Sequence, residues 1–291
     1  MRNPLTINSD SSEQLHYNLD LFPLYIHRDE LYNYDYQAII HWHPDLEFIY
    51  IEKGTMDFYV NGKTIRMCQG DGIFINSQRL HYGFSKEHQD CIFIALDISP
   101  DIFTQISPDV ESYMKKKFGL KNIDYIQLDK HVEWENQILM EVIKIYQIIS
   151  KTSFRPLLII SKAFTVADMI GEHIDDYQEN NYDSYDQDIF FKMTSYISQH
   201  FDEKITIDVL SKNVGISRNK CCELFQQFTK DSFLNYLTYY RFNKSIKLLK
   251  TTHLSILEIS QICGFSSPSY FTHLFKKEFN MTPKTYRRKY Q

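Results

Sequence analysis

TIDVLSKNVGISRNKCCELFQQF (Thr206–Phe228) and SILEISQICGFSSPSYFTHLFKKEF (Ser255–Phe279) are two copies of one pattern, and they decide the fold of the carboxyl-terminal third. Gly215 and Gly264 lie 49 positions apart, and the residues after them keep that offset. Each copy has apolar residues at helical spacing, a glycine able to adopt positive φ, and a serine able to cap a second helix. A helix, a short turn and a second helix present a recognition helix to the DNA major groove. The repeat therefore predicts two helix-turn-helix motifs.

Capping signals support the helix boundaries of the second copy. Ser255 and Glu258 have the spacing of a capping box, which pairs two backbone N–H groups at a helix start. Ser267 stands before Pro268, so a capping serine precedes a proline at the first helical position. These signals predict that one helix begins after Ser255 and another at Pro268.

A single long helix is expected between the two motifs. Residues 232–250 keep apolar residues at helical spacing and contain no helix breaker, which predicts about five turns. Thr282–Pro283 repeats the cap-and-proline arrangement ahead of a last basic helix, 284–289. Two motifs on a rigid connecting helix should reach two major-groove segments about one helical turn apart.

GFSSPSYFTHLFKKEFNMTPKTYRRKY (Gly264–Tyr290) resembles the signature of the AraC/XylS family of bacterial transcription regulators. The resemblance covers about the last hundred residues. It implies a seven-helix DNA-binding domain, a homodimer, and activation of transcription through contact with RNA polymerase. His273 stands where many members have an arginine that faces the bases, so the resemblance does not imply the recognised DNA sequence.

The two second helices supply the candidates for contacts with DNA. Apolar residues at helical spacing predict a buried face, which includes Tyr270, and they leave polar side chains outside. Asparagine can pair with adenine, glutamate with cytosine and arginine with guanine. The base-facing candidates are Arg218, Asn219, Cys222, Glu223, Gln226, Pro268, Ser269, Thr272 and His273. The phosphate-contact candidates, each of which could instead be an ordinary solvated charge, are Arg241, Lys244, Lys276, Lys284, Arg287 and Arg288.

The charge is divided unevenly along the chain. From Ile189 onward there are 16 Lys and Arg against 7 Asp and Glu, a net charge of +9. The rest of the chain has 16 against 30, a net charge of −14, so the total of −5 conceals the division. Such asymmetry favours double-stranded DNA as the partner of the carboxyl-terminal part.

The cysteines and the apolar stretches exclude several protein classes. The five cysteines are odd in number and show no CxxC spacing, so neither a disulfide framework nor a zinc finger is indicated. The sequence has no leader-like start and no run of 18 apolar residues. We therefore expect a soluble, cytoplasmic protein with no membrane partner.

From Leu21 to Ile98 the apolar pattern changes to a period of two. The expected strands are LFPLYIH, LEFIYIE, MDFYV, KTIRM, GIFIN and CIFIALDI. Asn61–Gly62, between MDFYV and KTIRM, predicts a type I′ hairpin. Several short strands without intervening helices predict a small β-barrel or jelly roll. The expected fold class is therefore α+β, with an amino-terminal barrel, packed helices and a carboxyl-terminal all-α domain.

HWHPDLEFIYIEKG (His41–Gly54) resembles the first cupin motif, and GDGIFINSQRLH (Gly70–His81) resembles the second. Asn76 and Gln78 stand where the second motif usually has proline and glycine, and the glycine expected before His41 is absent. The hairpin spacing keeps the fold inference intact. These departures weaken the inference of a metal site.

His41, His43, Glu47 and His81 are expected to converge from neighbouring strands, and three interpretations stay open. They could form the polar floor of a pocket for a small effector, hold Mn, Fe or Zn, or be satisfied core residues. Effector binding is our main hypothesis, with no cofactor expected. Members of the family often sense a small molecule such as a sugar. Trp42, Tyr50, Phe58 and Arg28 are further candidates for the pocket wall, although aromatic residues in a barrel more often belong to its core.

The expected organisation has four parts. Residues 1–98 form the effector-binding barrel, with 1–20 loosely ordered, and residues 99–176 form a helical segment packed on it. Within that segment 138–149 and 157–170 are apolar around more than half their circumference, and another helix is expected at 108–117. The resemblance implies a dimer surface there, although these helices could simply cover the barrel. Residues 177–188 form a polar linker, and 189–291 form the DNA-binding domain, which opens with a helix at 189–201.

The sequence thus predicts a sequence-specific transcription regulator, and not an enzyme, whose barrel binds a small polar effector. The alternatives are a metal-dependent cupin enzyme fused to a DNA-binding module, and an architectural DNA-binding protein with an inert barrel.

Overall fold

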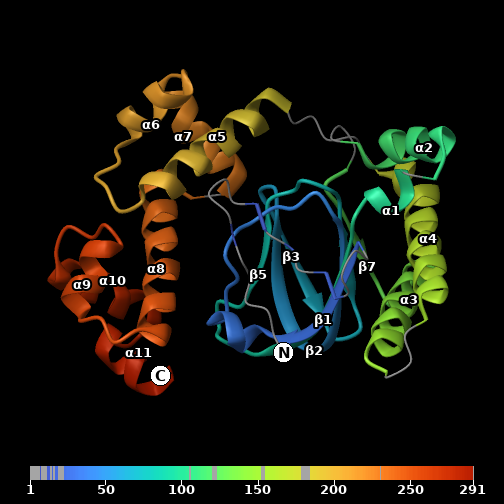
Figure 1. Cartoon of the computed structure of the whole chain (residues 1–291), viewed down its shortest axis with the longest axis horizontal. Coiled ribbons are helices and arrows are strands. Elements are labelled where there is room, and N and C mark those ends of the chain that lie inside the picture. The colour runs from blue at the N-terminus through green and yellow to red at the C-terminus, as the bar shows by residue number, and fades with distance from the viewer. Residues whose placement is uncertain are drawn as a thin grey trace. The chain divides into compact units, whose positions relative to one another are not determined.

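The computed structural model describes residues 23–290 except 105, 120–122, 152–154, 178–183 and 230, and before them residues 7, 12, 13, 15, 17 and 18. It divides into two compact units, the first running to Ser184 and the second from Tyr185 (Figure 1). Among the described helices, none combines the length and the apolar composition needed to cross a lipid bilayer.

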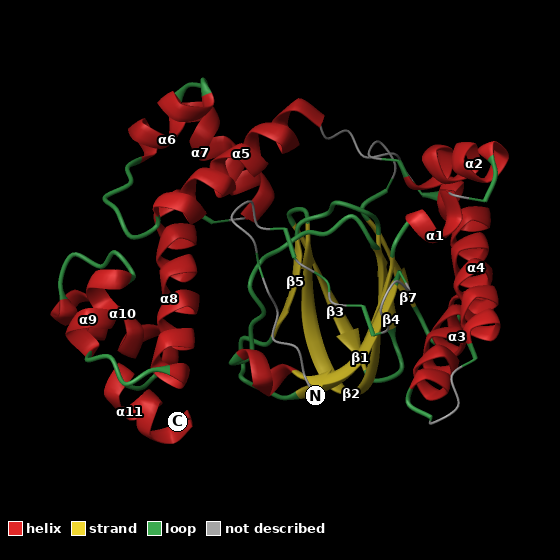
Figure 2. Ribbon diagram, in the orientation of Figure 1, coloured by secondary structure: helices red, strands yellow, loops and turns green. Residues whose placement is uncertain are grey.

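The first unit is built on antiparallel strands (Figure 2). In the described part of the chain these are β1 (Leu24–Glu30), β2 (Leu46–Val60), β3 (Lys63–Cys68), β4 (Gly72–Ile75), β5 (His81–Phe84), β6 (Cys91–Ile98) and β7 (Tyr125–Leu128). The order across the sheet is β1-β6-β2-β4-β7, and β3 and β5 both pair with β2. The predicted α+β class, with a cupin-like amino-terminal part, is confirmed.

The strands form a larger and a smaller sheet, and strand β2 belongs to both. The first half of β2 pairs with β4 and β6 in the larger sheet, and its second half pairs with β3 and β5 in the smaller sheet. The register shifts between Ile51 and Lys53, and Gly54 follows at a φ of 85°, where a side chain would collide with the Asp90 carbonyl. The two strands predicted at 46–52 and 56–60 are therefore one bent strand.

The turn between β2 and β3 has the predicted conformation. The short strands β5 and β7 were not predicted. Asn61 and Gly62 have φ of 40° and 92°, as a type I′ hairpin requires. Strand β5 was not predicted, because its four residues include Gly83 and two rings that carry polar groups, His81 and Tyr82. Strand β7 lies inside a stretch predicted to be helical and pairs with β4.

The strands carry a core on each face. One core lies between the two sheets and includes Ile49, Met56, Phe58 and Phe93. The other lies between the outer face of the larger sheet and a layer of helices. These are α1 (Asp101–Thr104), α2 (Pro108–Phe118), α3 (Glu133–Ile149) and α4 (Pro156–His173), with short 3₁₀ turns at Leu31–Tyr34 and Ile174–Asp176. The predicted helices 108–117, 138–149 and 157–170 are present and slightly longer than expected.

The second unit is entirely helical in its described residues. Its helices are α5 (Ser184–His200), α6 (Ile207–Val214), α7 (Arg218–Thr229), α8 (Phe233–Thr251), α9 (Ile256–Ile262), α10 (Pro268–Phe279) and α11 (Pro283–Tyr290). Helix α5 begins at Ser184, inside the predicted linker 177–188 and before the predicted start at Ile189. The reason is that Asp186, in its first turn, pairs with Lys220 of α7 at 2.9 Å. Residues 178–183 of that linker lie outside the described residues.

The predicted caps are present at both motifs. Ser217 and Ser267 accept hydrogen bonds from the backbone N–H groups of Lys220 and Tyr270. Ser255 and Glu258 form both hydrogen bonds of the capping box, at 3.1 and 2.7 Å. Gly215 and Gly264 have φ of 75° and 73°, so both turns use the conformation that favours glycine.

Helix α8 is unbroken and joins two hydrophobic lobes. Tyr236 packs against Phe190 and Phe225 of the first lobe, and Phe242 packs against Phe265 and Phe275 of the second. Because one helix contributes to both cores, the two helix-turn-helix motifs are held at a fixed separation within the unit (Figure 1).

Candidate functional site

The recognition helix of the first motif, α7, exposes one polar face. Its buried side is formed by Cys221, Leu224, Phe225 and Phe228. All five base-facing candidates on this helix are exposed, namely Arg218, Asn219, Cys222, Glu223 and Gln226. This exposed face carries guanidinium, amide and carboxylate groups, which are the kinds of group that can pair with the edges of DNA bases.

The second recognition helix, α10, is similar but less polar. Phe271 and Phe275 form its buried side. Ser269 and His273 are exposed, and Pro268 and Thr272 are half-buried. Tyr270, predicted to be internal, is 49% exposed, because its position falls one residue before the buried face. It therefore joins the candidates on the groove-facing side.

The phosphate-contact candidates divide into two groups. Lys276, Lys284 and Arg288 are exposed. Lys244 is half-buried, with its ammonium group 5.0 Å from the ring centre of Tyr240. Arg287 donates a hydrogen bond to the Leu254 carbonyl at 2.6 Å, so part of its guanidinium is engaged in a contact within the second unit.

Arg241 stands apart from the other candidates, because its guanidinium binds the chain itself. Its Nε and one terminal nitrogen donate to the carbonyls of Phe201 and Glu203, both at 2.7 Å. Burial lowers the pKa of Arg241 below its usual value. These carbonyls follow α5, and a side chain at Gly264, in the turn of the second motif, would collide with the Phe201 carbonyl. Arg241 is thus placed as a brace between the two lobes, which the sequence pattern could not reveal.

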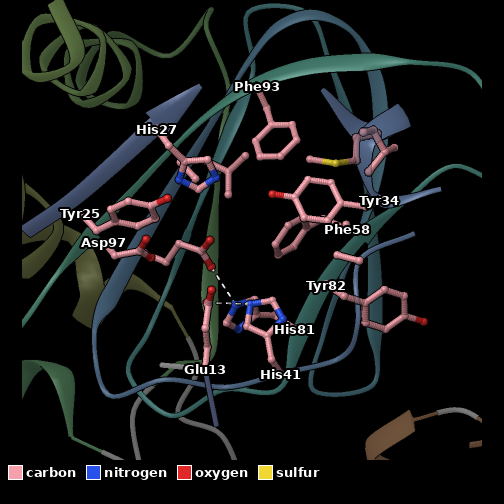
Figure 3. A pocket seen from close by; sticks show the side chains of 17 residues that line it. Glu13, Tyr25, His27, Tyr34, His41, Phe58, His81, Tyr82, Phe93 and Asp97 are labelled. Atoms are coloured by element: carbon pink, nitrogen blue, oxygen red, sulfur yellow. Dashed lines mark ion pairs between the residues drawn. The ribbon is translucent and has the colours of Figure 1, made fainter. Parts of the chain in front are cut away.

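The first unit contains an internal cavity between its sheets (Figure 3). Its volume is about 50 Å³. His41, His81 and Glu13 lie at one end, and the rings of Phe93 and Tyr34 lie at the other. The remaining lining residues are Tyr25, His27, Leu31, Ala38, Glu47, Ile49, Met56, Phe58, Tyr82, Gly83, Ala95 and Asp97. The cavity is polar at one end and largely aromatic and aliphatic elsewhere.

The four predicted cluster residues are brought together. The ring centres of His41 and His81 are 4.3 Å apart, and those of His43 and His81 are 4.9 Å apart. Glu47 Oε2 lies 3.0 Å from His81 Nε2 and 3.8 Å from His43 Nε2. His41, His81 and Glu47 line the cavity, and His43 lies behind them, with only 2% of its surface exposed.

Two acidic residues join this cluster that the sequence analysis did not select. Asp97, on β6, has its Oδ1 3.5 Å from His43 Nε2. Glu13, in the polar stretch before the strands, has its Oε2 3.5 Å from His41 Nε2, and its backbone N–H donates to the Trp42 carbonyl. Alternation along β6 could have placed Asp97 on the same face as Phe93 and Ala95. No local signal marked Glu13.

Three of the predicted pocket residues do not line the cavity. Glu47 and Ile49 point inward from β2, so Tyr50 points outward and packs in the core beneath the helices. The same alternation turns Arg28 outward on β1, where it pairs with Glu52 at 2.5 Å. Trp42 is half-buried beside the amino-terminal stretch, bridged to Ser12. Phe58, the fourth candidate for the pocket wall, does line the cavity, together with Tyr25 and His27, which the sequence analysis did not select.

Burial controls the charge of the cluster. It lowers the pKa of His41 well below the usual value, so that ring is neutral. It raises the pKa of Glu13 to about 8, with a further contribution from Glu47. It also raises the pKa of Asp97 well above its usual range. Burial opposes ionisation of Glu47 as well, but the adjacent His81 and His43 outweigh it and lower its pKa. Glu47 is therefore the principal fixed negative charge.

The chemistry of the cluster also fits a metal ion. The ligand atoms of His41, His43 and His81 lie within 4.8 Å of one another, as do those of His43, Glu47 and Asp97. Imidazole and carboxylate groups together suit Zn, Fe or Mn. The cluster can therefore hold a cation, or it can bind the polar part of a small organic molecule.

Comparisons with known proteins agree with both units. Residues 210–289 match a family model described as a helix-turn-helix domain, and residues 33–98 match a cupin domain. YdeC, an uncharacterized HTH-type transcriptional regulator of Bacillus subtilis, is 33% identical over 256 residues, which are 86% of this chain and 86% of that protein. The relatives with which the chain aligns are transcriptional regulators, not enzymes.

Two further similarities support less, because one covers only part of the chain and the other has low sequence identity. The xylose operon regulatory protein of Escherichia coli is 38% identical over 92 residues, which are 32% of this chain and 24% of that protein. The structure of an apo ToxT variant from Vibrio cholerae aligns with a TM-score of 0.50 and 13% identity, covering 95% of this chain and 100% of that one. This likeness supports the fold alone.

Proposed function

The chain belongs to the AraC/XylS family of helix-turn-helix transcription regulators with an amino-terminal cupin domain, and from that premise we propose that it is a sequence-specific regulator controlled by a small effector bound in the barrel. The proposal of DNA binding is supported by the unbroken helix α8 between two capped motifs. The proposal of effector binding is supported by the buried polar cluster at one end of an internal cavity.

The proposed mechanism is a shift between two arrangements of the protein. An effector can change DNA affinity only if it binds one arrangement more tightly than the other. We propose that the occupied barrel changes how a homodimer presents its DNA-binding domains, with α3 and α4 as its contact surface. Activation through RNA polymerase in the cytoplasm completes the proposal, which needs no cofactor besides the effector.

A small polar molecule is the proposed class of effector, and a sugar is one candidate. A volume of about 50 Å³ is well below the roughly 300–1,000 Å³ of most ligand pockets. A sugar would therefore have to enlarge the cavity by moving side chains such as Met56 and Leu31, whereas a smaller group would fit without such movement.

Operator affinity measured in the presence and absence of cell metabolites tests the proposal. Promoter fragments selected by the full chain would be titrated by fluorescence anisotropy, first alone and then with fractionated small molecules. We expect one fraction to change the affinity at least fivefold, and Glu47→Gln to abolish that response while leaving basal DNA binding intact. A response that survives Glu47→Gln would place the effector elsewhere, and an affinity that no fraction changes would contradict effector control.

A further inference from the structure

The first turn of the recognition helix α7 carries a lysine that the sequence analysis did not select. Lys220 directly follows Asn219, and its backbone N–H donates to the capping hydroxyl of Ser217 at 3.1 Å. In a helix-turn-helix motif the N-terminal residues of the recognition helix approach the base edges, and the phosphates of the groove flank them. A lysine stem is long and flexible, so the Lys220 ammonium group can reach a phosphate beside the bases that Asn219 would contact.

Two carboxylates hold the Lys220 ammonium group. Its Nζ lies 2.9 Å from Asp186 Oδ2 and 3.3 Å from Glu223 Oε1. Asp186 is in the first turn of α5, which packs beside α7 through the rings of Phe190 and Phe225 (Figure 1). The hydrogen bond to Asp186 raises the pKa of Lys220, so the lysine is charged. The side chain of Lys220 is 33% exposed, which leaves its ammonium group within reach of a second anion.

The two motifs differ in charge. Residues 205–229, which form the first motif, include three basic and two acidic side chains, and Asp186 adds a third acidic one. Residues 255–290, which form the second motif and α11, include six basic and two acidic side chains. Tyr270 takes the place of Lys220 in the second motif, since each stands three residues after its capping serine. Together with Asp186, the first motif therefore has no net charge with which to attract phosphates.

Asp186 and Glu223 hold Lys220 in different ways. Glu223 is on α7 itself and moves with Lys220, whereas Asp186 is on α5, two residues after the first unit ends at Ser184. A partly exposed ion pair gains little over its solvated ions, so a phosphate can replace Asp186 as the partner of Lys220. A displacement of the start of α5 would thus change the competition for this lysine.

We propose that Lys220 is a phosphate contact of the first motif and that Asp186 competes with DNA for it. The start of α5, the first helix after the sensing unit, then sets how tightly the first motif binds. This inference rests on the DNA-binding part of the proposed function.

Salt-dependent DNA binding of the full chain tests the proposal. Duplexes selected by the wild-type chain would be titrated by fluorescence anisotropy at several salt concentrations, with Asp186→Asn and with Asp188→Asn as the matched control. Asp188 is an exposed acidic residue of the same helix, so its replacement removes the same charge and measures long-range repulsion alone. Asp186→Asn in a Lys220→Gln background, compared with Lys220→Gln alone, shows whether any effect passes through the lysine.

We expect Asp186→Asn to bind at least threefold more tightly at low salt, with the salt dependence of log K increased by about 0.9, because Lys220 then neutralises one more phosphate. Asp188→Asn should change the affinity less than twofold. In the Lys220→Gln background the gain from Asp186→Asn should fall to that of the control.

A purely structural ion pair predicts the opposite result, which would overturn the proposal. Asp186→Asn would then lower the thermal unfolding midpoint measured by circular dichroism and weaken DNA binding, with the salt dependence unchanged. A gain of equal size in Asp188→Asn, or one that persists in full without Lys220, would also overturn it. In these cases the wild-type chain still binds DNA and the proposed function stands. If the wild-type chain binds no duplex in a salt-dependent manner, the proposed function fails, and the assignment of Lys220 fails with it.

Discussion

At the scale of single residues, the polar cluster depends on neighbours that hold its rings in place. Arg79 is 2% exposed, and its Nε lies 2.7 Å from Asp124 Oδ1, which also accepts from the Asn61 side chain. The Arg79 carbonyl fixes the ring of His81. A buried ion pair two residues from a cluster histidine thus connects the stability of the barrel with the geometry of the proposed effector site.

Replacing Arg79 by alanine should lower the free energy of unfolding of the first unit by about 3–5 kcal/mol, because it leaves the Asp124 charge buried without its partner. Tryptophan fluorescence during urea unfolding measures this. Arg66→Ala is the control, since Arg66 pairs with Asp57 at the surface and should cost less than about 1 kcal/mol. Equal losses in the two variants would show that the buried pair has no special role.

Glu13 should make the first unit less stable as pH rises. Its pKa is about 8 in the folded chain and 4.5 in the unfolded chain, so the folded state binds the proton more tightly. The stabilisation is complete below pH 4.5 and is lost as pH rises through 8, with a ceiling of about 5 kcal/mol. In Glu13→Gln the unfolding midpoint should exceed that of the wild type by a margin that grows between pH 5 and pH 9. A constant margin would show that Glu13 does not titrate in the cavity.

At the scale of the elements, we propose that α7 and α10 read the bases and that α11 contributes positive charge. Asn219→Ala and His273→Ala should each cost about 1–3 kcal/mol at one base position and relax the preference there. Lys284→Ala should weaken binding to all sequences alike and reduce the salt dependence of log K by about 0.9. Affinities for single-base variants of an operator at several salt concentrations measure both effects. Uniform losses from all three changes would refute the base-facing assignment.

Replacing Arg241 should have different effects on DNA binding if its side chain braces the two lobes than if it contacts a DNA phosphate. As a brace, Arg241→Met should weaken binding to a double site about tenfold, leave binding to a single half-site nearly unchanged, and keep the salt dependence. As a phosphate contact it should lower the salt dependence by about 0.9 on both kinds of site. Titrations of single-site and double-site duplexes at several salt concentrations decide between the two.

The elements predicted well from sequence are those with local signals. Caps at Ser255 and Ser267 and the glycine turns are written in adjacent residues, and so both motifs and α8 have their expected bounds within a residue or two. Strands β5 and β7 have only four residues each, too few for a period to be recognised. The start of α5 depends on an ion pair with α7, which is a contact between distant residues.

The site was predicted in part for the same reason. His41, His43, Glu47 and His81 lie on motifs with fixed spacing, and the structure brings them together. Tyr50 and Arg28 were wrong as pocket residues, because strand alternation turns them to the outer face. The base-facing assignments remain predictions, although the exposure of α7 and α10 is consistent with them.

At the scale of the whole molecule, we propose that the first unit senses the effector and that the second unit binds DNA. A fragment of residues 184–291 keeps all of α5, including Asp186 with its partner Lys220. We expect this fragment to be monomeric and to bind DNA more weakly than the full chain, because a dimer gains affinity from its second DNA-binding domain. Sedimentation and anisotropy measurements check this. A fragment that binds as tightly as the full chain would argue against dimerisation through the first unit.

The central claim is that α8 holds two groove-reading motifs at a fixed separation. It is tested most directly by the affinity of the second unit for duplexes whose two half-sites are moved relative to each other. Half-sites centred about 10–10.5 base pairs apart face the same side of the DNA, and five inserted base pairs turn one of them to the opposite side. We expect that insertion to reduce the affinity to that of a single half-site, and insertion of a full turn not to restore it. Equal affinity for every spacing would contradict the claim.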